Sequence, residues 1–122
     1  MQNAAQAYGR VAKQIASPRE LEANLLLQAA SRLQAVRDTS NRHRPELDDA
    51  LLFNRKLWSI FLASVTREDN PLPAAVRQNI ANLGLYVMNQ TMTTLGDPRP
   101  EQLGSLIAIN REVAAGLMGR AA

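Results

Sequence analysis

The six prolines of this 122-residue chain separate segments whose apolar residues recur at helical spacing. Proline is tolerated in the first turn of a helix but not further along, because it lacks a backbone N–H group and its ring clashes with the preceding turn. The prolines are Pro18, Pro45, the pair Pro71 and Pro73, and the pair Pro98 and Pro100. These four interruptions predict five helices.

Two of the boundaries carry further helix signals. The segment Ser17-Pro18-Arg19-Glu20 has the pattern of a capping box, with Ser17 as the cap and Glu20 as the carboxylate that reaches back to it. Gly96 precedes the last two prolines, as is typical of a helix end followed by a new start. We therefore expect a first helix over residues 4–16, whose apolar face is narrow and rich in alanine. Four more helices are expected, three that begin at Pro18, Pro45 and Pro73 and one that covers residues 101–118.

The composition favours a helical core. Hydrophobic residues make up 46% of the chain and charged residues 20%, which is an ordinary balance for a globular protein. Aromatic residues account for only 4%, so the core must consist mainly of aliphatic residues and alanine, the best helix former. No segment alternates as a strand would. The sequence predicts an all-α fold: a single domain over residues 1–122, forming a bundle of about five helices joined by short loops that contain proline and glycine.

Two asparagines interrupt otherwise apolar stripes. Asn54 lies on the stripe of the third helix, one turn before Trp58, and Asn110 lies on the stripe of the fifth. An amide buried without a partner costs roughly 1 to 3 kcal/mol, so both side chains must form hydrogen bonds. Either each amide ties together neighbouring backbone inside the fold, or the two face a groove and meet the backbone of a bound chain.

The fourth helix carries two apolar rows. The first, predicted to face inward, consists of Val76, Ile80, Leu83 and Val87, and the second of Leu85, Met88, Met92 and Leu95. Methionine side chains are flexible and polarizable, so they adapt to apolar helices of different shapes. The second row therefore either completes the core or forms a groove for an incoming helix.

The sequence contains no cluster of chemically reactive residues. It has no cysteine, and its single histidine, His43, lies in a polar loop between two arginines. Its glycines are isolated, so no phosphate-binding loop is present. We predict that the protein is not an enzyme and needs no cofactor or metal. The first residues lack the pattern of a secretory signal, and no apolar stretch approaches the roughly 20 residues that cross a bilayer, so we expect a cytoplasmic protein without a membrane span.

Nucleic-acid binding has little support. The formal net charge is only +3. A basic group, Arg32, Arg37, Arg42 and Arg44, could contact phosphates, but no aromatic residue lies between Tyr8 and Phe53 to stack on bases. We expect this group to form a solvated face, and any direct RNA contact to be weak and unselective.

Five short motifs, in the same order and at similar spacing, resemble the FlaF family of flagellar regulators. They are Ala7-Tyr8, Ser17-Pro18-Arg19-Glu20-Leu21-Glu22-Ala23, Asn54-Arg55-Lys56-Leu57-Trp58, Asn70-Pro71-Leu72-Pro73 and Ile109-Asn110-Arg111-Glu112-Val113-Ala114. The resemblance spans nearly the whole chain, and it implies a small cytoplasmic protein of flagellum biogenesis and cell motility without catalytic activity.

The resemblance also implies a function in flagellin production and export. It suggests a chaperone that binds the amphipathic terminal helices of flagellin and controls flagellin synthesis and export, with FlbT as a second candidate partner. The alternatives are a post-transcriptional regulator of flagellin messenger RNA, acting directly or through FlbT, and a structural adaptor of the export machinery. The candidate partner-binding residues are Asn54, Arg55, Trp58, Leu85, Met88, Met92, Leu95, Asn110 and Arg111.

Overall fold

The computed structural model describes residues 18–38 and 44–119. These residues form four helices and no strand: α2 (Pro18–Asp38), α3 (Arg44–Val65), α4 (Ala74–Gly96) and α5 (Pro100–Leu117). The all-α prediction is confirmed for the described part of the chain. The expected helix over residues 4–16, the Ser17 cap and His43 lie outside it.

Proline marks the helix starts as the sequence predicts. The second helix begins at Pro18 itself, and α5 begins at Pro100. The third begins at Arg44, one residue before Pro45. Pro73 directly precedes α4 with φ of −56°, a value that its ring imposes and that suits entry into a helix. The prolines therefore determine where each helix can begin.

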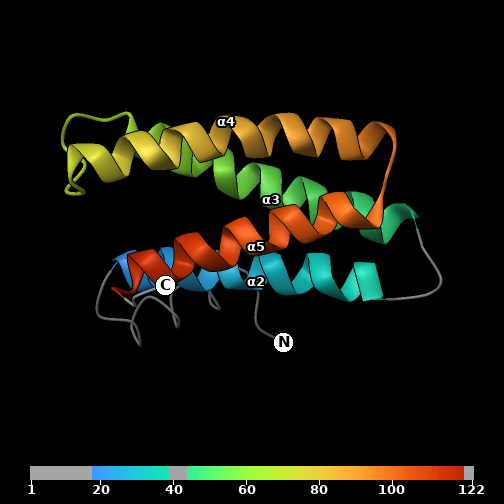
Figure 1. The fold of residues 1–122 in the computed structure, drawn as a ribbon. Coiled ribbons are helices and arrows are strands. Elements are labelled where there is room, and N and C mark those ends of the chain that lie inside the picture. The colour runs from blue at the N-terminus through green and yellow to red at the C-terminus, as the bar shows by residue number, and fades with distance from the viewer. Residues whose placement is uncertain (1–17, 39–43, 120–122) are drawn as a thin grey trace, which may run out of the picture.

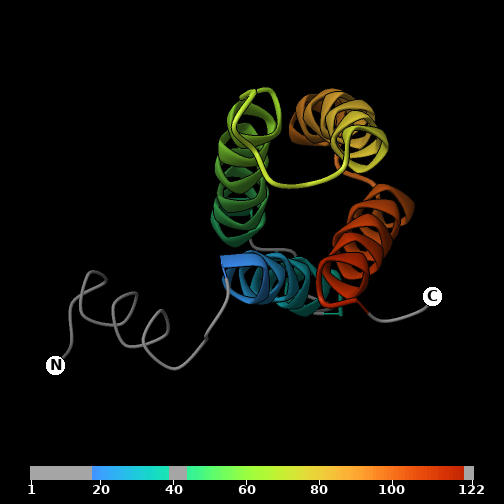
Figure 2. The same cartoon turned by 90° about the vertical axis from the view of Figure 1, so that its left-hand side faces the viewer.

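The four helices run alternately up and down (Figure 1), and each packs against two neighbours, so together they form a closed ring. In the view along the bundle, α2 packs against α3 and α5, and α4 packs against the same two helices (Figure 2). The α2–α5 pair is packed most extensively and the α4–α5 pair least. As a result, α3 and α5 face each other across one diagonal of the ring, and α2 and α4 across the other. None of the described helices is both long and apolar enough to cross a membrane.

Small side chains allow the helices to approach closely. Ala23, Ala29 and Ala30 of α2 are buried, and so is Ala114 of α5. The larger core side chains fill the space between the helices. They include Leu26, Leu33, Leu51, Trp58, Val87 and Leu106. The core is therefore mainly aliphatic, as the composition predicts.

The inward row predicted for α4 is correct only in part. Ile80 and Val87 are buried, but Leu83 is half-buried and Val76 is exposed. Val76 lies in the first turn of α4, where its side chain is 39% exposed. The positions that complete the inward face are small, namely Gly84, Thr91 and Thr94.

Gly84 packs tightly against α3. A Cβ atom at this position would collide with the Leu62 side chain, whose Cγ would lie only 2.7 Å away. Glycine in a helix costs up to about 1 kcal/mol relative to alanine. At this position the absence of a side chain is what allows Leu62 to pack against the backbone of α4.

We predict that Gly84→Ala destabilises the protein although alanine favours helices. Crowding against Leu62 should cost about 1–3 kcal/mol, against a gain of about 1 kcal/mol in helix propensity, so the net loss should reach up to about 2 kcal/mol. Chemical denaturation followed by circular dichroism measures the free energy of unfolding. Gly116→Ala is the control, because a Cβ atom there would meet nothing within 4 Å. Equal stability gains for both variants would show that the α3–α4 contact is not tight.

Candidate functional site

The predicted site residues Asn54, Trp58 and Asn110 lie together at the centre of the bundle, and none of the three is exposed at all. Trp58 Nε1 donates a hydrogen bond to Asn110 Oδ1 at 2.9 Å. Asn110 Nδ2 donates to Asn54 Oδ1 at 2.6 Å and to the backbone carbonyl of Leu26 at 3.4 Å. The amides therefore form hydrogen bonds inside the fold, mostly with side chains, and no bound chain can reach them while the bundle is closed.

This polar network connects three helices. Asn54 and Trp58 belong to α3, Asn110 to α5 and Leu26 to α2. Because α3 and α5 lie on a diagonal of the ring, the hydrogen bonds cross the core where the two backbones are too far apart to touch (Figure 2). The geometry therefore gives these three residues a part in holding the bundle together.

The second row of α4 lies at the surface. Leu85 is 62% exposed and Met92 55% exposed, while Met88 and Leu95 are half-buried and pack against the core. Monomeric proteins expose single apolar side chains routinely, but several along one face form a patch that can bind a partner. The row therefore forms an apolar strip along α4.

A hollow of about 400 Å³ lies beside this strip, between α3 and α4. Met88 lines it from α4, and Leu52, Arg55, Lys56 and Ser59 line it from α3. Leu52 is 47% exposed, so apolar surface continues from α4 onto α3. The structure thus brings together Arg55 and Met88, two residues that the sequence marked separately.

The charge of this surface comes from α3 alone. The only charged residue of α4 is Arg77, which donates to the backbone carbonyl of Arg67 at 3.0 Å and so is directed toward the end of α3. Arg55 and Lys56 are exposed at the hollow. We refer to Leu85, Met88, Met92 and Leu95 together with this hollow as the α3–α4 surface. It is apolar along α4 and positively charged along α3, which suits an amphipathic helix with acidic residues at one edge.

Arg111 lies elsewhere on the molecule. It is exposed on α5 and donates a hydrogen bond to Gln34 Oε1 of α2. It therefore belongs to the α2–α5 side of the ring. The nine predicted residues fall into three places: the core network, the α3–α4 surface and this α2–α5 contact.

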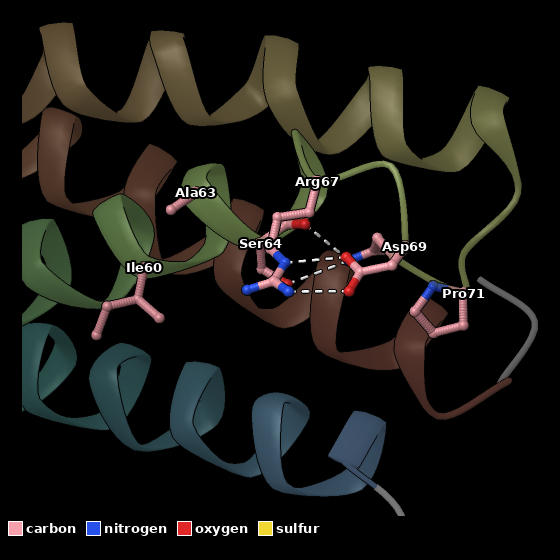
Figure 3. A pocket seen from close by; sticks show the side chains of 7 residues that line it. Ile60, Ala63, Ser64, Arg67, Asp69 and Pro71 are labelled. Atoms are coloured by element: carbon pink, nitrogen blue, oxygen red, sulfur yellow. Dashed lines mark hydrogen bonds and ion pairs between the residues drawn. The ribbon is translucent and has the colours of Figure 1, made fainter.

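A second hollow of about 400 Å³ lies at the turn between α3 and α4 (Figure 3). Arg67 forms a two-point ion pair with Asp69, with hydrogen bonds of 2.9 and 2.8 Å. This hydrogen-bonded guanidinium lowers the pKa of the Asp69 carboxyl group below its usual value. The ion pair occupies the polar groups of both residues.

The family-like segment Asn70-Pro71 builds the same turn. Asn70 Nδ2 donates to the backbone carbonyl and the hydroxyl of Ser64, both at 3.1 Å, and Asn70 Oδ1 accepts from the backbone N–H of Leu72 at 3.0 Å. These hydrogen bonds close the connection between the helices. The geometry supports a structural function for Asn70.

Within the described residues, no group of three His, Asp or Glu side chains could hold a metal ion.

Of the α3 residues that line the hollow beside Met88, the sequence indicated only Arg55. Leu52, Lys56 and Ser59 were not among the predicted residues, although Leu52 lies off the apolar stripe of α3 and its neighbours one helical turn away, at positions 48, 49, 55 and 56, are all charged. An apolar residue away from the core stripe was the available signal. Its proximity to Met88 depends on how α3 and α4 pack, which the sequence pattern of one helix does not contain.

Comparison with known proteins identifies one family. The family model described as Flagellar protein FlaF matches residues 4–117, which is nearly the whole chain. No curated protein and no solved structure matches the sequence.

We predict that Asn110→Ala destabilises the fold strongly. The substitution leaves Trp58 Nε1 and Asn54 Oδ1 buried without their partner, at about 1–3 kcal/mol for each group, so the total loss should be about 2–6 kcal/mol. The exposed Asn79 of α4 provides the control, since Asn79→Ala should change stability by no more than about 0.5 kcal/mol.

The network also predicts that the two asparagines are coupled. Asn54→Ala should cost much less in the Asn110→Ala background than in the unchanged protein, because its hydrogen-bond partner is already gone. A double-mutant cycle of unfolding free energies measures this coupling. Additive losses would mean that the hydrogen bond contributes nothing of its own.

Proposed function

Because the chain belongs to the FlaF family of flagellar proteins, we propose that it is a flagellum assembly regulator that binds flagellin as a chaperone and controls flagellin synthesis and export. Terminal helices of unassembled flagellin are amphipathic, and their apolar faces must be covered before export. The observation that carries this proposal is the exposed apolar row of Leu85, Met88 and Met92 beside the hollow lined by Leu52. A flagellin helix is the occupant that we assign to the α3–α4 surface.

The physical chemistry of the surface supports this assignment. An amphipathic helix binds a groove through apolar side chains spaced three and four residues apart, and the row on α4 has the same spacing. Met88 and Met92 can adjust their shape to different apolar side chains. Arg55 and Lys56 attract acidic residues at the edge of the bound helix. Together these features favour a helix over an extended peptide, for which no open sheet edge exists in the described residues.

Control of flagellin synthesis is assigned to the same binding event. The complex with flagellin forms when unexported subunits are present. We propose that this complex acts on flagellin production through FlbT. This route requires no direct contact between the chain and messenger RNA. The exposed basic residues near the surface, Arg55 and Lys56, lie beside apolar side chains rather than beside aromatic rings that stack on bases.

Met92→Asp tests the proposal most cleanly, because Met92 is exposed and its substitution should leave the fold intact. The carboxylate is hydrated in the free protein and loses that hydration only in the complex, so the affinity for flagellin should fall at least about tenfold while the melting temperature stays unchanged. Titration calorimetry with purified flagellin measures the affinity. Met88→Asp should weaken binding as well, with some loss of stability because Met88 is half-buried.

The matched control is Ala108→Asp, which places the same charge at an exposed position of α5. It should leave both flagellin affinity and stability unchanged. Normal binding by a stable Met92→Asp variant would remove the row on α4 from the interface. Recovery of flagellin messenger RNA instead of flagellin with the protein from cells would favour the RNA-regulator alternative.

A further inference from the structure

The hollow at the turn between α3 and α4 combines paired polar groups with uncovered apolar ones (Figure 3). Its two charged residues, Arg67 and Asp69, are joined in an ion pair, and Asn70 donates a hydrogen bond to Ser64. Ile60 is 58% exposed. It belongs to the apolar and exposed part of the lining, which consists of Ile60, Ala63 and Pro71. An occupant of this hollow therefore gains most by bringing apolar side chains that remove this surface from water.

The start of α2 lies at the same end of the bundle as this hollow, the left-hand end in Figure 1. Arg32 of α2 lies over the ring of Phe53 of α3, with 4.1 Å between its Cζ atom and the ring centroid. The two helices are antiparallel. Pro18 precedes Arg32 by as many residues as separate Phe53 from the later Arg67. Because both helices rise equally per residue, Pro18 lies about level with Arg67, at the edge of the hollow.

The residues before Pro18 are tied to this end of the molecule. They lie outside the described residues, but their sequence carries the apolar stripe Ala4, Tyr8, Val11 and Ile15. Only two residues separate Ile15 from Pro18, so their Cα atoms can lie no further apart than about 11 Å. The stripe therefore begins within reach of the hollow.

We propose that residues 4–16 pack as a helix along the outer side of α3, antiparallel to α2, and cover Ile60 and the hollow at the turn. Two helices joined by so short a connection form an antiparallel hairpin. Val11 lies seven residues before Pro18, and Ile60 lies seven residues before Arg67. In the hairpin Val11 therefore comes to lie beside Ile60.

Three observations favour this segment over another occupant. It is attached to the bundle, so its effective concentration at the hollow is about millimolar without any free partner. It contains Arg10 and Lys13 and no acidic residue, whereas residues 19–22 and 67–69 together hold four acidic and two basic residues, so the charges are complementary. The FlaF family model matches from residue 4 onward, so the segment belongs to the part of the chain that the family shares.

This contact is separate from the proposed flagellin site. The α3–α4 surface consists of the row on α4 and the hollow beside Met88, and none of its residues lines the hollow at the turn. The proposal therefore does not depend on flagellin binding, and both experiments that test it use the full chain without flagellin.

Disulfide trapping tests the contact directly, because the sequence contains no cysteine of its own. In the double variant Val11→Cys, Ile60→Cys, the packed segment brings the two sulfur atoms within reach of a disulfide. Under mild oxidation this pair should form an intramolecular disulfide at least about tenfold faster than the control pair Val11→Cys, Ala108→Cys, whose second position is exposed on α5. Thiol titration measures the rate, and peptide mass identifies the bond.

Tryptic cleavage tests the same contact without added cysteines. Arg10 and Lys13 are the only trypsin sites before Arg19. The carboxylate of Ile60→Asp would lose its hydration under the packed segment, so the segment should detach and cleavage after these two residues should accelerate at least about tenfold. Ala108→Asp is the control and should be cleaved as slowly as the unchanged protein.

Circular dichroism shows whether the helices of each variant are intact. If Ile60→Asp has lost its helices, Val11→Asp replaces it, because this change introduces the same charge outside the described helices and has the same expected outcome. Two results would each overturn the proposal. One is a disulfide that forms no faster at residue 60 than at residue 108, and the other is cleavage after Arg10 and Lys13 that is as fast in the unchanged chain as in the Asp variant.

Discussion

The hydrogen bonds from Trp58 to Asn110 and from Asn110 to Asn54 are the interaction on which this arrangement of helices depends. They cross the centre of the bundle between α3 and α5, whose backbones do not approach each other closely. An aliphatic core of leucine and alanine can repack in several registers at small cost. A buried amide cannot, because any shift of one helix along its axis separates donor from acceptor and leaves both desolvated. The network therefore selects one register of α5 against α3, and the contact of Asn110 with Leu26 extends that choice to α2.

Specificity of this kind has a cost in stability. Asn54 Nδ2 is buried and has no hydrogen-bond partner among the described residues. Apolar side chains in place of Asn54 and Asn110 would remove that penalty, but they would also leave the indole N–H of Trp58 without an acceptor. The three residues are consequently a unit in which each requires the others. In the sequence, Asn54 and Trp58 are four residues apart, and both asparagines lie on otherwise apolar stripes.

Local features of the sequence predicted the helices well, and features that depend on packing were not predictable from it. Proline acts within one turn of its own position, so Pro18, Pro73 and Pro100 placed three helix starts to within a residue. The need of Asn54 and Asn110 for partners followed from their apolar surroundings, but the identity of those partners depends on which helices share a diagonal. Val76 was wrongly expected to face inward, because periodicity gives the direction of a side chain and not the point at which the core ends. The hollow lined by Leu52 and Met88 lies between two helices, so the apolar pattern of one helix alone could not predict it.

The distribution of side chains on α4 argues that its outer surface is used. Its inward positions are occupied largely by small residues, and Thr91 and Thr94 satisfy their hydroxyls by donating to the backbone carbonyls of Val87 and Gln90, each at 2.7 Å. Because these inward side chains are small, α4 can lie close to α3 at Gly84. Packing alone would place the large apolar residues inward, yet Leu85 and Met92 are directed outward, where the fold gains little from them.

An exposed apolar strip on a free protein favours aggregation. The flagellin helix that we propose as the occupant of the α3–α4 surface would remove Leu85 and Met92 from water. The free energy of covering these two side chains would then contribute to binding and not to folding.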